Sequence, residues 1–165
     1  MKRTYWIYKN VDCGFNIEKV PIYLDRREEE GDFDTGRVLF ESTGQVDEIW
    51  GSDVKFEVTW EKCNRTTYNH GAKIKESIEI YNTLEVSVIK KQQEWIKSHE
   101  MTYWVGTRNK IKRKRFYAST IIHALYLCEV TERFFEIHAE IISALFPNYE
   151  KLILDAIKSM NCHDL

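Results

Sequence analysis

The sequence predicts an α+β fold, in which an N-terminal antiparallel β-sheet is followed by three or four α-helices. The first observation is the segment VKFEVTWEK at residues 54–62, where apolar and polar side chains alternate with the period of two of a half-buried strand. The second is a change of pattern at Asn82, after which apolar residues recur every three or four positions. The third is the absence of glycine and proline from residues 107–146, which favours helices.

Further strands are expected in the first half of the chain, which carries weaker strand patterns. The connecting segments at residues 28–36, 42–44 and 64–71 are polar and contain glycine, as hairpin loops do. The predicted strands are residues 3–9, 15–24, 37–42, 46–50, 54–62 and 74–81. Together they indicate an antiparallel sheet.

Helix signals begin at Asn82-Thr83-Leu84-Glu85, where a capping residue precedes Glu85 by three positions in a variant of the capping box. A first helix is expected from there to about Ser98. Two apolar stripes within residues 107–146 predict two helices that break near residues 129–131, with one long helix as the alternative. Pro147 ends this segment, and the apolar stripe in residues 152–160 predicts a last helix.

The chain of 165 residues, 43% of them apolar, is long enough to bury a hydrophobic core. We expect a single compact domain over residues 1–165. It can be divided into a β-rich lobe at residues 1–81 and a helical lobe at residues 82–165. The helical lobe is the surface through which a homo-oligomer would form.

The four cysteines, Cys13, Cys63, Cys128 and Cys162, are far apart in the sequence and include no C-x-x-C pair. This distribution indicates buried thiols in a reducing cytoplasm. No signal-peptide pattern or membrane-spanning stretch is found, so we expect a cytoplasmic protein without a membrane partner. Cys162 and His163 are adjacent ligand types without partners in the sequence, and neither a metal site nor a cofactor is predicted.

Charge is unevenly distributed along the chain, whose net charge is −2. Residues 1–62 carry 9 Lys and Arg against 14 Asp and Glu, residues 63–120 carry 12 against 5, and residues 121–165 carry 3 against 7. The middle of the chain is therefore basic and both ends are acidic.

The basic residues concentrate in the segment TRNKIKRKRFYAST at residues 107–120. Such a cluster favours phosphate through charge-assisted hydrogen bonds, and nearby aromatic rings can stack on bases. The predicted nucleic-acid-binding residues are Arg108, Lys110, Lys112, Arg113, Lys114, Arg115, Trp104 and Tyr117. The first hypothesis is therefore a small non-enzymatic binding protein whose partner is RNA, DNA or an acidic protein surface. In the alternative, the run is a solvated connector that binds nothing.

A protein-interaction module, such as an inhibitor, immunity or adaptor protein, is the second hypothesis. Small size, a high aromatic content and the lack of a catalytic motif fit it equally well. Its binding surface would be formed by exposed aromatic residues or by the acidic loop at residues 28–34.

Two short motifs match catalytic elements without their required context. His138-Ala139-Glu140 matches the H-x-E element of zinc deaminases, but no P-C-x-x-C follows it. Asp34-Thr35-Gly36 matches the triplet of aspartic proteases, but hydrophilic residues precede it, and this indicates a turn.

The residues Arg133-Phe134-Phe135-Glu136-Ile137-His138 resemble the R-x(4-6)-H motif of the HEPN ribonucleases, which are helical-bundle enzymes that cleave RNA without a metal ion. The resemblance implies that His138 is the acid or base and Arg133 the phosphate ligand, on nearly the same face of a helix. Phe134 departs from the family's pattern, where a polar residue usually follows the arginine. A metal-independent ribonuclease is therefore the third hypothesis.

Overall fold

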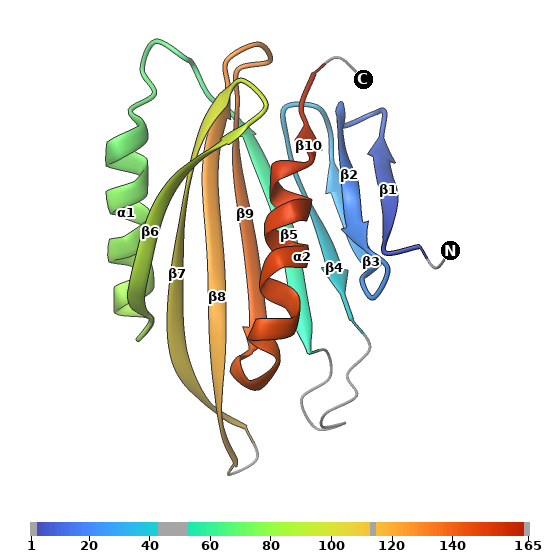
Figure 1. Cartoon of the computed structure of the whole chain (residues 1–165). Helices are drawn as coiled ribbons and strands as arrows, with labels where there is room; N and C mark the ends of the chain where they lie inside the picture. The colour runs from blue at the N-terminus through green and yellow to red at the C-terminus, as the bar shows by residue number, and fades with distance from the viewer. Residues whose placement is uncertain (1–2, 43–52, 113–114, 164–165) are drawn as a thin grey trace.

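The computed structural model of the chain describes residues 3–42, 53–112 and 115–163. Within these ranges the strands form two antiparallel sheets, one of seven strands in the order β3-β4-β5-β9-β8-β7-β6 and one of three in the order β1-β2-β10 (Figure 1). The strands are β1 Tyr5–Asn10, β2 Phe15–Pro21, β3 Asp25–Gly31, β4 Thr35–Glu41, β5 Val54–Lys62, β6 Ser87–Ile96, β7 His99–Lys112, β8 Arg115–Cys128, β9 Arg133–Ile142 and β10 Met160–Asn161. The helices are α1 His70–Thr83, the short η1 Ser143–Leu145 and α2 Phe146–Lys158.

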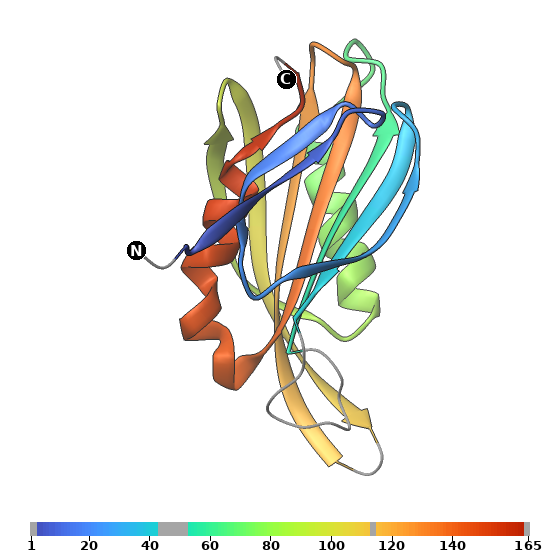
Figure 2. The ribbon, with the colours of Figure 1, turned by 90° about the vertical axis from the view of Figure 1, so that its right-hand side faces the viewer.

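The main core lies between the seven-stranded sheet and a second layer made of α2 and the three-stranded sheet (Figure 2). β5 contributes alternate residues, Val58 and Trp60 among them, while the residues between them face the other side of the sheet. α2 is amphipathic and buries Ile153, Ala156 and Ile157. The predicted strand at residues 54–62 and the predicted last helix are confirmed.

α1 covers part of the opposite face of the large sheet, next to β6 and β8. Its Ile74 belongs to a smaller core that includes Trp104 of β7 and Ile121 of β8. The side chain of Asn69 accepts a hydrogen bond from the backbone nitrogen of Ala72, which caps the first turn of the helix.

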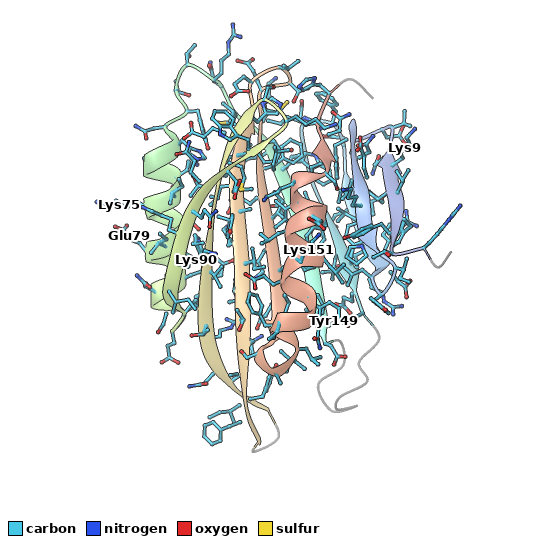
Figure 3. All side chains as sticks on the ribbon, in the orientation of Figure 1. Lys9, Lys75, Glu79, Lys90, Tyr149 and Lys151 are labelled. Atoms are coloured by element: carbon cyan, nitrogen blue, oxygen red, sulfur yellow. The ribbon has the colours of Figure 1, made fainter. Side chains whose placement is uncertain are left out.

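Charged side chains cover the outer surfaces of both helices. Lys75 and Glu79 on α1 and Lys151 on α2 point away from the sheet in Figure 3. The side chains of Lys151 and Asp155 form an ion pair one helical turn apart, with 2.6 Å between Nζ and Oδ2. Neither α1 nor α2 is long and apolar enough to cross a membrane.

Arg133 is a fully buried cation that ties three parts of the chain together. Its guanidinium donates hydrogen bonds to the carbonyl oxygens of Cys13, Gly14, Phe33 and Cys162, including one of 2.7 Å to Gly14 and one of 3.0 Å to Cys162. These acceptors lie in the β1–β2 connection, the β3–β4 connection and the segment after β10. Burial lowers the pKa of Arg133, and the ring of Phe33 lies over the guanidinium at 4.0 Å.

The predicted fold class is wrong, because the described residues are mostly β-structure and contain only two α-helices. The helix expected from Asn82 to Ser98 is replaced by strand β6, and the helices expected within residues 107–146 are replaced by β7, β8 and β9. The strand expected at residues 74–81 lies inside α1. Residues 82–165 are therefore mostly strands, with α2 as the one α-helix that lies wholly among their described residues, and a homo-oligomer formed through a helical lobe is not supported.

The cause of this error is clearest in β8, which is buried on both faces. Ala124 and Tyr126 pack in the main core, whereas Ile121 and Leu125 pack in the smaller core beneath α1. A strand covered on both sides reads as a continuous apolar run without alternation, and such a run also fits a buried helix.

The predictions for the first part of the chain agree better with the structure. The strands expected at residues 3–9, 15–24 and 37–42 correspond to β1, β2 and β4. Most of β3 was wrongly expected to be a loop, because residues 28–36 are polar and contain glycine. It is an edge strand that is exposed at every position, and its charges protect the sheet edge from pairing. The strand predicted at residues 46–50 lies outside the described residues.

Candidate functional site

The far end of the β7–β8 hairpin forms an arm, defined here as residues 108–112 and 115–118. β6 pairs with β7 only as far as Thr107, and β9 pairs with β8 only from Ser119 onward. In the described part of the sheet, residues 109–112 therefore pair only with residues 115–118, and Arg108 pairs with Ser119 at the base of the arm. Figure 2 shows the arm extending beyond the rest of the sheet.

One face of the arm is apolar and exposed. Ile111 and Phe116 are direct cross-strand partners, so their side chains lie on the same face. Ile111 is 66% exposed and Phe116 is 77% exposed. The next pair on this face, Asn109 and Ala118, is also exposed.

The other face of the arm begins with an ionic cluster around Glu140 of β9. Arg108 Nη2 lies 2.7 Å from Glu140 Oε2, Lys110 forms an ion pair with the same carboxylate, and Ser119 Oγ donates to it over 2.9 Å. Burial acts to raise the pKa of Glu140, but the hydrogen bonds and charges of Lys110 and Arg108 outweigh it and lower the pKa to about 2. Two of the six cations in the basic run are therefore engaged by a single carboxylate.

The remaining predicted binding residues lie in different surroundings. Lys112 pairs with Arg115 at the last described rung of the hairpin, and Arg113 and Lys114 lie outside the described residues. Tyr117 is half-buried, and burial raises its pKa.

Trp104 lies on the same face of the sheet as Glu140 but is fully buried. Its ring stacks on His123 at 5.2 Å, and its Nε1 donates to Ser77 of α1 over 2.9 Å. A ring held in this way presents no free face on which a base could stack. The structure therefore separates Trp104 from the cations with which the sequence analysis grouped it.

Arg133 and His138, the two residues of the HEPN-like motif, do not form a pair. Both lie on strand β9, where a separation of five residues puts them on opposite faces of the sheet. Arg133 points into the main core, whereas His138 lies beneath α1, 2.9 Å from His123 between their Nδ1 atoms. Burial, followed by the proximity of His123, lowers the pKa of His138 to about 3. The predicted helical arrangement is wrong, and the ribonuclease hypothesis loses its basis.

A second group of chemically active side chains lies at the opposite end of the sheet from the arm. It consists of His99, Cys128, Cys162 and His163, whose ligand atoms all lie within 4.8 Å of one another. His99 begins β7, Cys128 ends β8, and the other two follow β10. The first three are buried and His163 is partly buried.

Hydrogen bonds connect this group internally. His99 Nε2 lies 3.1 Å from His163 Nε2 and 3.5 Å from Cys162 Sγ, while Glu129 Oε2 lies 2.6 Å from His99 Nδ1. The hydrogen bond from the Cys162 thiol lowers the pKa of Cys128 to about 3, against the opposing effect of burial. The same bond, together with burial, raises the pKa of Cys162.

The sequence analysis did not predict this group. Its only signal was the adjacent pair Cys162 and His163, because His99 and Cys128 lie 63 and 34 residues before Cys162. The strand order that joins the ends of β7 and β8 to the C-terminal segment cannot be read from spacing.

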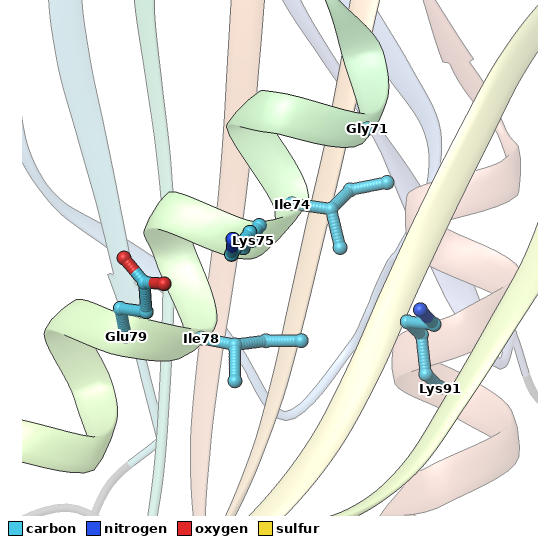
Figure 4. A pocket seen from close by; sticks show the side chains of 6 residues that line it. All are labelled: Gly71, Ile74, Lys75, Ile78, Glu79 and Lys91. Carbon is cyan, nitrogen blue, oxygen red and sulfur yellow. The ribbon is translucent and has the colours of Figure 1, made fainter.

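An open pocket of about 430 Å³ lies between α1 and β6. Figure 4 shows Ile74 and Ile78 pointing into it from α1, with Lys91 of β6 across from them. Lys75, Glu79 and Gly71 complete the lining. The polar groups of this lining are two lysines and one carboxylate, and the six residues include no histidine, cysteine or hydroxyl group.

Solved structures of other proteins have a similar fold. No protein-family model and no curated protein matches the sequence. Cyanobacterial PsbP from Synechocystis sp. PCC 6803 is similar in structure, with a TM-score of 0.61, 7% sequence identity, and coverage of 94% of this chain and 90% of that one.

The Ran-binding protein Mog1p of Saccharomyces cerevisiae is similar with a TM-score of 0.58 and 9% identity, over 92% of this chain and 91% of that one. A protein from Bacteroides thetaiotaomicron gives a TM-score of 0.52 and 14% identity, over 96% of this chain but 48% of its own length. Identities this low establish a shared fold and nothing further.

Proposed function

We propose that the chain is a small non-enzymatic binding protein that docks on an acidic protein surface through the β7–β8 arm. The observation that carries this proposal is the exposed pair Ile111 and Phe116 at the end of a hairpin that extends past its neighbouring strands. No catalytic role is assigned to any residue of the arm.

The apolar face of the arm suits a protein partner. Large apolar side chains exposed together and surrounded by polar residues mark interaction surfaces. Aromatic residues are enriched among the contacts that dominate binding energy, and Phe116 has most of its surface available for burial. A hairpin that extends from its sheet can enter a groove without rearrangement of the sheet.

Charge complementarity selects the kind of protein surface. Residues 107–120 contain six Lys and Arg and no Asp or Glu. Glu140 from β9 offsets one of these charges, so the arm remains cationic. A partner with acidic residues around an apolar groove would therefore be attracted at long range by the charge of the arm. At contact, burial of the apolar face of the arm in the groove would hold it in place.

A protein partner is favoured over nucleic acid for two reasons. Trp104, one of the aromatic residues expected to stack on bases, is fully buried. Mog1p, which has the same fold, is described as a Ran-binding protein, so this fold occurs in a protein that binds another protein. We also propose a reducing cytoplasmic location, since all four cysteines are free thiols.

The proposal is tested with a double variant, Ile111→Ser with Phe116→Ser, and a matched control, Ile89→Ser. Ile89 on β6 is as exposed as Ile111, at 66%, but lies outside the arm. Proteins captured from nuclease-treated extract would be purified, and their binding to each variant measured by calorimetry. We expect the double variant to bind at least about tenfold more weakly and the control to bind like the unmodified protein. Equal weakening in both variants would contradict the proposal, as would partners that are captured only from extract that has not been treated with nuclease.

A further inference from the structure

We propose that His99, Cys128, Cys162 and His163 bind one Zn²⁺ ion as a four-ligand structural site. The site is independent of the arm, which lies at the other end of β7 and β8. Two thiols and two imidazoles are a ligand set that zinc prefers, whereas magnesium and calcium require oxygen ligands.

The distances within the group fit a tetrahedral zinc ion. Zinc bonds of about 2.0–2.1 Å to nitrogen and about 2.3 Å to sulfur place neighbouring ligand atoms roughly 3.3–3.8 Å apart in a tetrahedron. The separation of 3.1 Å between His99 Nε2 and His163 Nε2 and that of 3.5 Å between His99 Nε2 and Cys162 Sγ are already close to these values. The widest separation of the four, within 4.8 Å, needs about 1 Å of closure, which side-chain rotation can supply.

Glu129 gives this group the outer-shell partner that zinc-bound histidines usually have. Its carboxylate lies 2.6 Å from Nδ1 of His99, so Nδ1 is the nitrogen that carries the proton. Nε2, which faces the two other ligand side chains, is then free to bind the metal through its lone pair. This arrangement fixes the tautomer and the ring orientation of the ligand.

The positions of the ligands assign a structural role to the ion. Four protein ligands complete the coordination of zinc and leave no position for a substrate. The ion would join the start of β7 and the end of β8 in the large sheet to the segment that follows β10 of the small sheet. It would thereby fasten the C-terminal segment beside the hydrogen bond that Arg133 donates to Cys162.

The experiment uses the full chain, reduced and stripped of metal with a chelator. Zinc would be titrated in, and metal content measured by mass spectrometry after removal of the excess. We expect one zinc per chain and a higher Tm in its presence. Cobalt in place of zinc should give the visible absorption of a tetrahedral thiolate site, which reports the geometry directly.

Variants separate a specific site from adventitious binding. Cys128→Ser and His163→Ala should reduce zinc from one equivalent to nearly none, and His163, which is only partly buried, should tolerate substitution without unfolding. Glu129→Gln should retain zinc with an affinity about tenfold to a hundredfold weaker. Cys63→Ser removes a thiol outside the group and should bind zinc normally. Equal zinc binding by all four variants would overturn the proposal, as would a reduced protein that takes up no zinc or cobalt.

Discussion

Ile111 and Phe116 face each other across the β7–β8 hairpin, and both side chains are largely exposed although they are among the most apolar in the chain. Burial of such side chains normally stabilises a fold, by about 1.5–3 kcal/mol each. Here that free energy is not used in folding. It remains available for association with another molecule.

The double variant Ile111→Ser with Phe116→Ser should therefore fold as well as the unmodified protein. We expect the free energy of unfolding in urea to change by about 1 kcal/mol or less, since only a cross-strand contact is lost. Phe135→Ala is the contrasting variant, because Phe135 is fully buried and stacks on Tyr126 at 5.1 Å. It should cost about 3–5 kcal/mol. A large loss of stability in the arm variant would show that the pair is part of the folded core.

Arg133→Met should destabilise the protein strongly. The substitution leaves the carbonyl oxygens of Cys13, Gly14 and Cys162 without their donor, and each unsatisfied buried group costs roughly 1–3 kcal/mol. We expect a total loss above about 3 kcal/mol in urea unfolding. Arg26→Met is the control, since Arg26 is exposed and its ion pair with Glu29 should contribute less than about 1 kcal/mol. Similar midpoints for the two variants would refute the structural role of Arg133.

Glu140 should make stability depend on pH in acid. Its folded-state pKa of about 2 lies below the ordinary value of 4.5, so the ionised carboxylate stabilises the folded protein above about pH 4.5. This stabilisation is lost as the pH falls from about 4.5 to about 2. Glu140→Gln should abolish this part of the dependence, and the difference between the two proteins should shrink by on the order of 2 kcal/mol across that range, after allowance for solvent screening. Parallel stability curves for the two proteins would argue against the ion pairs with Arg108 and Lys110.

Sequence reasoning worked where one face of an element is buried and the other is in water. In β5, Phe56 and Trp60 alternate with Glu57 and Glu61, and the pattern predicted the strand. In α2, Ile153 and Ile157 lie one turn apart, and the pattern predicted the helix. Both predictions rest on contrast between two faces, which is visible in a single sequence.

The same reasoning failed where that contrast is absent or misleading. β8 is apolar on both faces, so its residues around Ile122 read as a helix. α1 shows the opposite error, because Ile74, Ile78 and Ile80 mimic strand alternation although Ile80 is half-exposed on the helix surface. In both cases the deciding factor is which layers cover the sheet, and this depends on tertiary packing.

The two candidate sites also differ in how much of each can be recognised from the sequence. The basic run at residues 107–120 was visible as local composition, but its apolar partner face was not, since pairing of Ile111 with Phe116 requires a hairpin. The group around His99 depends on contacts between residues up to 64 positions apart, as in the pair with His163. Only the strand order of the sheet could reveal it.

Contact between the apolar face of the arm and a protein can be detected with a photo-crosslink. The photoreactive residue p-benzoylphenylalanine would replace Phe116 and, as a control, Ile89 of β6, which is also largely exposed. After irradiation in cells, we expect a discrete protein adduct at position 116 that resists nuclease, is absent at position 89, and is lost when Lys112→Glu and Arg115→Glu are added. Identical adducts at both positions, or a nuclease-sensitive adduct at position 116, would contradict the proposed contact.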